Sequence, residues 1–83
     1  MYKYLIIFEK TKTGFSAYSP DVPGCIATGK TKKSTEKNMK EAIEFHIEGL
    51  LQEGLKIPKP MVSDVEFLNF QFDKKINKSL AIV

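Results

Sequence analysis

The chain has 83 residues, of which 42% are hydrophobic, and its formal net charge is +3. This length and apolar content predict one small folded domain and exclude a disordered chain or a two-domain protein. All 13 basic residues are lysines, which lack the planar fork that arginine uses to bind phosphate or guanine, so the composition is not typical of a dedicated nucleic-acid reader.

The sequence offers no signal for a membrane, a secretory route, a disulfide or a metal. Its single cysteine, Cys25, cannot form an internal disulfide, and no Cys/His cluster has zinc-finger spacing. No apolar run approaches the roughly 18 residues of a membrane helix, and the N-terminus lacks a signal-peptide pattern. We therefore expect a cytoplasmic protein without metal or cofactor.

The first part of the chain predicts three short strands. Residues 2–10 are rich in aromatic and β-branched types, a turn follows at Thr13-Gly14, and residues 15–18 return as the second strand of a hairpin. Residues 19–24 combine two prolines, an aspartate able to bond its own backbone and a glycine, which is turn chemistry. Residues 25–28 form the third predicted strand, which Gly29 ends.

Apolar residues recur at every second position in the predicted strands, but over residues 31–53 they recur with a period of 3.6. This spacing predicts an amphipathic helix lying on the sheet. Thr31 is the expected N-cap and Gly54 the expected stop. The acid of a capping box is missing, because Ser34 stands at its position. The predicted buried stripe consists of Met39, Ile43, His46, Ile47 and Leu50.

Beyond the helix, residues 55–60 read as an extended connector and residues 62–72 as a last strand whose alternation slips at Phe67-Leu68. The predicted fold is α+β, with order βββαβ and one helix packed on a mixed, mostly antiparallel sheet whose first strand is central. Residues 1–72 would form this domain. Residues 73–83 would form a tail, whose apolar end at residues 80–83 can pair back as an extra strand, and no separate DNA-binding domain is predicted.

One sequence motif spans the turn, the third strand and the helix. It reads Pro-Asp-Val-Pro-Gly-Cys-Ile-Ala-Thr-Gly-Lys-Thr over residues 20–31 and continues with Asn38 and Glu41-Ala42-Ile43. Over residues 2–67 the chain resembles the N-terminal domain of HicB-type antitoxins. The resemblance implies a partial ribonuclease H-like fold without nuclease activity, which binds and inhibits a small mRNA-cleaving toxin of the HicA type. It therefore implies an antitoxin and not an enzyme.

The candidate partner-binding residues come from the turn and the helix. The turn is rigid and is predicted to be exposed, as recognition loops often are, although a purely structural turn is an equally good interpretation. Phe45 points away from the buried stripe at 100° per residue, so either the tail or another chain is expected to cover it. The set is Pro20, Asp21, Val22, Pro23, Gly24 and Phe45.

A possible anion patch lies at the helix start, where Lys30, Lys32 and Lys33 oppose the helix dipole. A solvated face is the commoner interpretation of such charges. The alternative function is a stand-alone nucleic-acid-binding module that uses these lysines, and a purely structural homo-oligomer is a third hypothesis. Salt dependence separates nucleic-acid binding from an apolar protein interface.

Catalysis is not expected. A ribonuclease H-type site needs carboxylates in the middle of the first strand, but this strand offers only Lys3 before Glu9 at its far end. His46 and Cys25 are interpreted as structural core residues. The first strand carries large apolar groups on both faces and one helix covers only one face, so we also expect a homo-dimer or higher oligomer.

Overall fold

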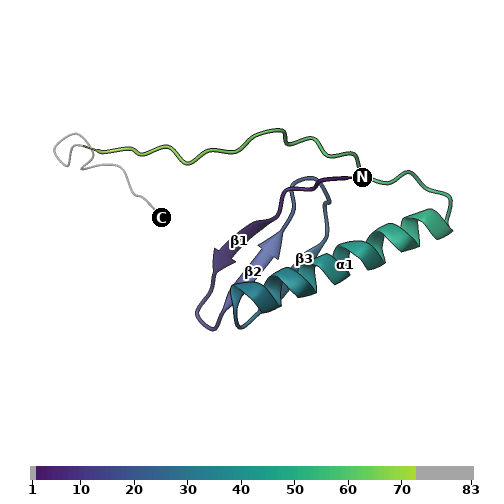
Figure 1. Ribbon diagram of the computed structural model, residues 1–83, viewed down its shortest axis with the longest axis horizontal. Helices are drawn as coiled ribbons and strands as arrows, with labels where there is room; N and C mark the ends of the chain where they lie inside the picture. The colour runs from purple at the N-terminus through teal and green to yellow at the C-terminus, as the bar shows by residue number, and fades with distance from the viewer. Residues whose placement is uncertain (1, 73–83) are drawn as a thin grey trace.

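The computed structural model describes residues 2–72, which form a small antiparallel sheet with one helix on one face (Figure 1). The strands are β1 (Ile7–Lys10), β2 (Phe15–Tyr18) and β3 (Ile26–Gly29), and the helix is α1 (Lys32–Gln52). The class is α+β, as predicted. Within the described residues the order of the elements is βββα.

β2 is the central strand of the sheet, whose order is β1-β2-β3. Tyr18 faces Ile7 on one side and Ile26 on the other, and both ladders are antiparallel. The prediction that the first strand is central is therefore wrong for the part of the chain described. The reason is that β1 was expected to gain a second neighbour from residues 62–72, which do not join the sheet.

The hairpin turn between β1 and β2 packs closely against β3. In the hairpin turn the Thr11 amide donates to the Gly14 carbonyl at 2.8 Å, and the Gly14 amide donates to Thr11 Oγ1 at 3.1 Å. A side chain at Gly14 would overlap the carbonyl oxygen of Gly29. The β1–β2 turn therefore packs against the end of β3, where only glycine leaves enough space.

The helix begins and ends within one residue of its predicted bounds. Thr31 caps the first turn: its Oγ1 accepts from the Ser34 amide at 3.0 Å, while Ser34 Oγ accepts from the Thr31 amide at 3.1 Å. The capping box is thus complete, with a serine hydroxyl in the role that an acid usually takes. Glu53 is the C-cap, and Gly54 follows with a φ of 71°, a value that favours glycine.

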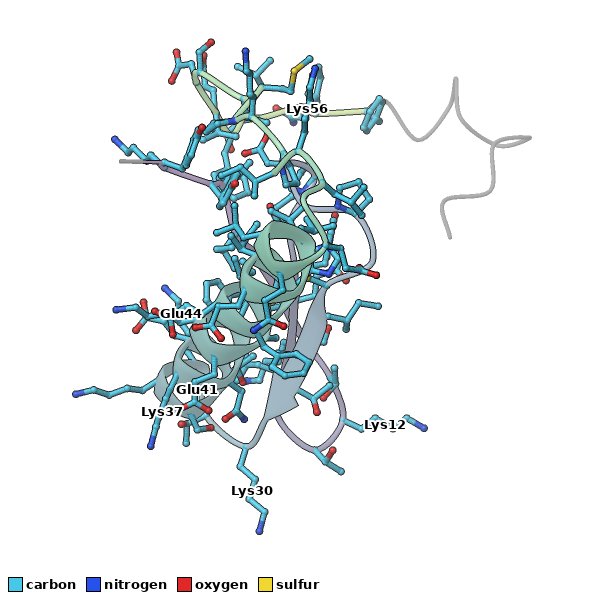
Figure 2. All side chains as sticks on the ribbon, turned by 90° about the vertical axis from the view of Figure 1, so that its right-hand side faces the viewer. Lys12, Lys30, Lys37, Glu41, Glu44 and Lys56 are labelled. Atoms are coloured by element: carbon cyan, nitrogen blue, oxygen red, sulfur yellow. The ribbon has the colours of Figure 1, made fainter. Side chains whose placement is uncertain are left out.

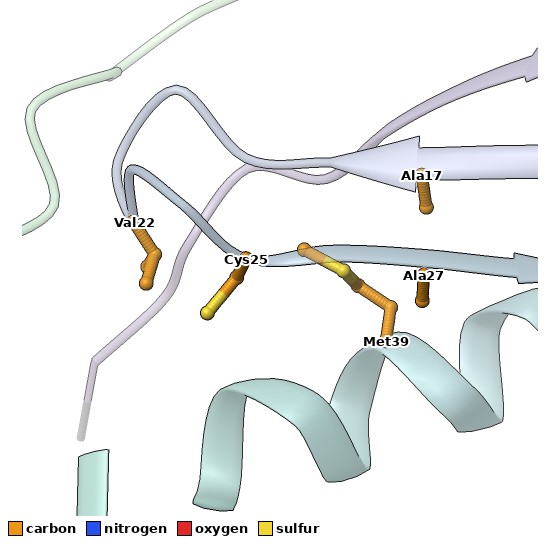
Figure 3. Packing of buried hydrophobic residues seen from close by; sticks show 5 residues of the cluster. All are labelled: Ala17, Val22, Cys25, Ala27 and Met39. Carbon is orange, nitrogen blue, oxygen red and sulfur yellow. The ribbon is translucent and has the colours of Figure 1, made fainter. Parts of the chain in front are cut away.

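The core is small and lies between the sheet and the first half of α1. Figure 3 shows Met39 reaching from the helix toward the strands that carry Ala17 and Ala27, whose short side chains let the helix approach the sheet. Of the predicted stripe, Met39 is buried and Ile43 packs against the core, whereas His46, Ile47 and Leu50 are only half-buried. The buried apolar residues are Ala17, Val22, Cys25, Ala27 and Met39.

The strand predicted over residues 62–72 is not formed. These residues follow an extended course that leads away from the sheet (Figure 1) and pair with no strand of the described chain. Their apolar side chains stay in solvent, and Phe67 is fully exposed. The local alternation predicted an extended segment correctly, but a strand also needs a partner edge. The predicted tail, residues 73–83, lies outside the described residues.

Candidate functional site

The turn between β2 and β3 is held by one buried carboxylate. Asp21 Oδ2 accepts from the Leu5 amide at 3.0 Å, and Asp21 Oδ1 accepts from the Met61 amide at 2.9 Å and the Val62 amide at 3.2 Å. Asp21 itself is buried, with 4% of its surface exposed. It therefore ties together the N-terminal segment, the turn and the connector that follows the helix.

The amide donors hold the pKa of Asp21 below its ordinary range. The largest contribution comes from the Leu5 N–H and the next from the Met61 N–H, burial acts in the opposite direction, and the Val62 N–H adds a smaller lowering. Asp21 was predicted to bond its own backbone, and this prediction is wrong. That local role falls to Ser19, whose Oγ accepts from the Asp21 amide at 3.1 Å.

The structure separates the predicted loop residues into two groups. Asp21 and Val22 are buried, and Val22 is part of the hydrophobic core (Figure 3), so their side chains are not available to a partner. Pro20, Pro23 and Gly24 are exposed on the outside of the turn. The inner side of the loop is therefore structural, and its outer side is exposed.

Phe45 lies beside the exposed end of this loop. Its ring is 80% exposed, and it borders a hollow of about 410 Å³ between α1 and β3, to which Gly24 also contributes. Ile26 on β3 is 68% exposed and lines the same hollow, together with Gly49. We call this surface the Phe45 hollow. It joins two residues predicted from the sequence, Gly24 and Phe45, and adds Ile26, which the sequence analysis did not single out.

Acidic residues surround the ring on the helix. Glu41 and Glu48, four positions before and three after Phe45, are its neighbours on the helix surface, and both are exposed. Glu53 lines the hollow itself. From Glu41 to Glu53 the helix carries four glutamates and no lysine. The Phe45 hollow is thus an apolar surface with an acidic rim, although the chain as a whole is basic.

The predicted anion patch is exposed but spread out. Lys30, Lys32 and Lys33 all lie on the surface, and the first turn of α1 contains no acidic residue. Lys32 Nζ sits 5.2 Å from the centroid of the Phe8 ring, a cation–π geometry, so this lysine is partly engaged within the chain. Figure 2 shows Lys12 and Lys30 extending outward at the same end of the molecule, which makes this end basic.

The single cysteine is a core residue, whereas the single histidine lies at the Phe45 hollow. Cys25 is buried, and its burial raises the pKa of the thiol above the ordinary value, which makes it a poor nucleophile. His46 is half-buried and lines the Phe45 hollow. Among residues 2–72 no group of three or more histidine, cysteine or acidic side chains could hold a metal ion. In the same residues, no helix is long and apolar enough to span a membrane.

These features define a small α+β domain with exposed apolar surfaces suited to binding other proteins. The chain belongs to the HicB-like antitoxin family of bacterial toxin-antitoxin systems, whose sequence profile matches residues 4–82. The predicted resemblance is thereby confirmed. The family consists of antitoxins, in agreement with the prediction that the chain is not an enzyme.

Two solved structures are similar to the chain. A chain of the "HicA3 and HicB3 toxin-antitoxin complex" is 42% identical with a TM-score of 0.63, and the match covers 72% of this chain and 70% of that one. The "Antitoxin HicB3 crystal structure" is 25% identical with a TM-score of 0.60, and the match covers 93% of this chain and 78% of that one.

Sequence relatives occur in a phage and in an archaeon. A 14.9 kDa protein of Haemophilus phage HP1 is 46% identical over 56 residues, and that match takes in 68% of this chain but only 42% of the phage protein. A UPF0150 protein of Thermoplasma acidophilum is 39% identical over 64 residues, which are 76% of this chain and 93% of that protein. The chain thus spans less than half of the phage relative and nearly all of the archaeal one.

Proposed function

We propose that this chain binds and inhibits a HicA-type toxin, and that the toxin docks on the Phe45 hollow. The observation that carries the proposal is the 42% identity to a chain of the HicA3–HicB3 complex over 72% of this chain. A cytoplasmic setting and a partial ribonuclease H-like fold are parts of the same proposal. The lone, buried Cys25 suits a reducing compartment.

The chemistry of the Phe45 hollow supports it as the docking site. Large side chains that a partner buries, above all aromatic ones such as Trp and Tyr, are enriched among interface hot spots, and Phe45 is exposed beside an edge strand. A toxin that cleaves RNA needs positive charge to hold phosphates. The acidic rim, with Glu53 in the hollow and Glu41 exposed four positions before Phe45, complements such a partner and would speed its association.

The proposal is tested by measuring binding of a HicA-type toxin to the full chain by isothermal titration calorimetry. Phe45→Ala should weaken binding by at least about tenfold, because hot-spot aromatics dominate interface energies. The matched control is Leu51→Ala, since Leu51 is exposed on the same helix but does not line the hollow. This control should bind like the wild type. Co-expression with the toxin should likewise restore growth for the wild type and the Leu51 variant and less so for the Phe45 variant.

These measurements test the toxin-inhibiting function and the docking site at the Phe45 hollow separately. If the wild-type chain neither binds the toxin nor relieves growth arrest, the proposed function is wrong. If it binds and the Phe45→Ala variant binds equally well, the function stands and the docking site is wrong.

The alternative function, nucleic-acid binding through the lysines at the helix start, is distinguished by salt. Affinity for a single-stranded RNA should fall about 10³-fold or more between 50 and 200 mM salt if several phosphates are contacted. We expect only weak binding at either concentration, because only Lys33 of the three lysines at the helix start lines the groove between α1 and the segment that leads into β1, and Lys32 lies over Phe8.

A further inference from the structure

A second apolar surface lies on the opposite side of the helix, and the proposed function does not use it. It is a groove of about 1180 Å³ between α1 and the N-terminal segment that leads into β1. The helix packs on β3 and β2, so the β1 side of the sheet is left without a cover. We call this surface the β1 groove. Its apolar lining includes Tyr4, Ile6, Phe8, Met39, Ile43 and Ile47, and charged residues of the helix border it.

The strand beside this groove has a free edge. Within residues 2–72 β1 pairs only with β2 and stands at the edge of the sheet. Its outward N–H and C=O groups are therefore open to another strand. An exposed edge next to an apolar groove is the arrangement that natural sheets usually cover, because it invites pairing with another segment.

The segment after Val62 has the properties of the missing strand. Residues 63–72, which we call the arm, are extended, and their one hydrogen bond among the described residues is the local bond from the Val65 amide to Asp64 Oδ1. Leu68, Phe70 and Phe72 share one face, and Phe70 is 72% exposed. Val65 and Phe67 share the other face. Apolar side chains on both faces indicate a strand that is covered on both sides.

The same two-sided pattern occurs in the segment that the arm would join. Tyr4, Ile6 and Phe8 face the groove, while Leu5 and Ile7 alternate with them. Three apolar residues at a spacing of two on the arm thus match three apolar residues at a spacing of two along the groove. This arrangement extends the row of cross-strand pairs that stabilises a sheet.

We propose that the arm of one copy pairs with the free edge of β1 in a second copy, placing Leu68, Phe70 and Phe72 over the β1 groove. The two copies exchange arms around a two-fold axis. This exchange supplies the fourth strand that the sequence predicted, but from the other chain.

The geometry favours a second copy over the arm's own domain. The bonds from Met61 and Val62 to Asp21 fix the point at which the arm leaves, and from there the arm runs away from its own sheet (Figure 1). Ten extended residues span about 33 Å, more than the roughly 20 Å needed to lie along residues 5–10. The match to the HicB3 antitoxin crystal structure covers 93% of the chain, so it extends past the helix into the arm.

The first test is the mass of the full chain at micromolar concentration, by sedimentation equilibrium. We expect twice the chain mass of 9.4 kDa. Phe70→Asp should raise the dimer dissociation constant at least about tenfold, because it places a charge in the groove. Asn69→Asp is the matched control, since it adds the same charge at a neighbouring position that is already polar and does not face the groove, and it should stay dimeric. A wild-type monomer, or a dimer equally tolerant of Phe70→Asp and Asn69→Asp, would overturn the proposal.

The second test shows whether the arm pairs within one chain or between two. In a Cys25→Ala background, Ile6→Cys is combined in turn with Leu68→Cys, Phe70→Cys or Phe72→Cys, and the proteins are oxidised. Arm exchange predicts a disulfide-linked dimer on non-reducing denaturing gels in at least one of the three. A disulfide that forms only within single chains, or none in any of the three, would refute the exchange. Toxin binding by Phe70→Asp should equal that of the wild type, because the arm does not line the Phe45 hollow.

Discussion

Asp21 Oδ1 accepts the Met61 amide at 2.9 Å, although the two residues are 40 positions apart in the sequence. The same carboxylate also accepts the Leu5 amide. One side chain thus fixes where the first strand segment enters the sheet and where the arm leaves it. Without this link the connector after the helix would be joined to the domain mainly through the Tyr4 hydroxyl, which donates to the Pro58 carbonyl at 2.6 Å.

The first prediction is that Asp21→Asn destabilises the fold. The amide side chain keeps the shape but loses the negative charge and replaces one acceptor oxygen with a donor, so at least one of the three backbone N–H groups loses its partner. We expect the midpoint of thermal unfolding, followed by circular dichroism, to fall by about 5 °C or more. Asp64→Asn is the control, because Asp64 is exposed and accepts only from the adjacent Val65 amide. Equal midpoints for the two variants would contradict the role assigned to Asp21.

The second prediction concerns acid. The pKa of Asp21 is lowered in the folded state, so the stability that this carboxylate contributes is present above its unfolded-state pKa of about 4 and is lost as the pH falls through the lower folded-state pKa. The wild type should therefore lose more stability than Asp21→Asn between pH 5 and pH 2. Thermal midpoints measured at half-unit pH steps would show the two curves converging as the pH falls. If the thermal midpoints of the two proteins fall in parallel with pH, the lowered pKa of Asp21 does not contribute to stability.

The third prediction uses the helix start, where a serine stands in for the usual acid of the capping box. Ser34→Glu should stabilise the protein by about 0.5–1 kcal/mol, because a carboxylate would cap the Thr31 amide and would add the first negative charge to the initial turn of α1. Ser34→Ala should destabilise it, since the Thr31 amide would lose its acceptor. Urea unfolding of the two variants and the wild type gives the order, and a Glu variant no more stable than the Ala variant would refute the argument.

Local signals predicted the elements of this fold well. The strand over residues 15–18 has the predicted bounds, and the helix ends differ by one residue at each end, because turn residues, caps and periodicity act over a few positions. The third strand is shifted by one residue and includes Gly29, and the first, predicted over residues 2–10, is a regular strand only at Ile7–Lys10, where it pairs with β2. The 100° spacing alone placed Phe45 off the buried stripe, and its ring is exposed in the described residues. These features depend on neighbours in the sequence, which the sequence displays directly.

The errors concern partners that are distant in the sequence. The alternation in residues 62–72 predicts an extended segment, but it does not say which edge the segment pairs with, so the central position of the first strand was predicted wrongly. The role of Asp21 was missed for a related reason. Its partners are backbone amides, which every residue except proline carries, so no residue type marks positions 5, 61 and 62 as donors.

The last prediction contrasts Gly29, the last residue of β3, with Gly49, which lies inside α1. A Cβ on Gly29 would come within 2.6 Å of Ser34 Oγ and 2.8 Å of the Thr35 amide nitrogen. Thr35 is fully buried and its amide belongs to the helix, so it cannot move alone. Gly29→Ala must therefore push β3 away from the helix start and should cost about 1–3 kcal/mol.

Gly49→Ala should act in the opposite direction. Gly49 lies inside α1, and a Cβ there would meet no atom within 4 Å. Alanine at such a helical position is worth up to about 1 kcal/mol more than glycine. Urea unfolding should therefore move the midpoint down for Gly29→Ala and up for Gly49→Ala, with similar slopes, because the surface exposed on unfolding hardly changes. If Gly29→Ala unfolds at the wild-type midpoint, the close approach of β3 to the start of α1 is looser in solution than the structure has it.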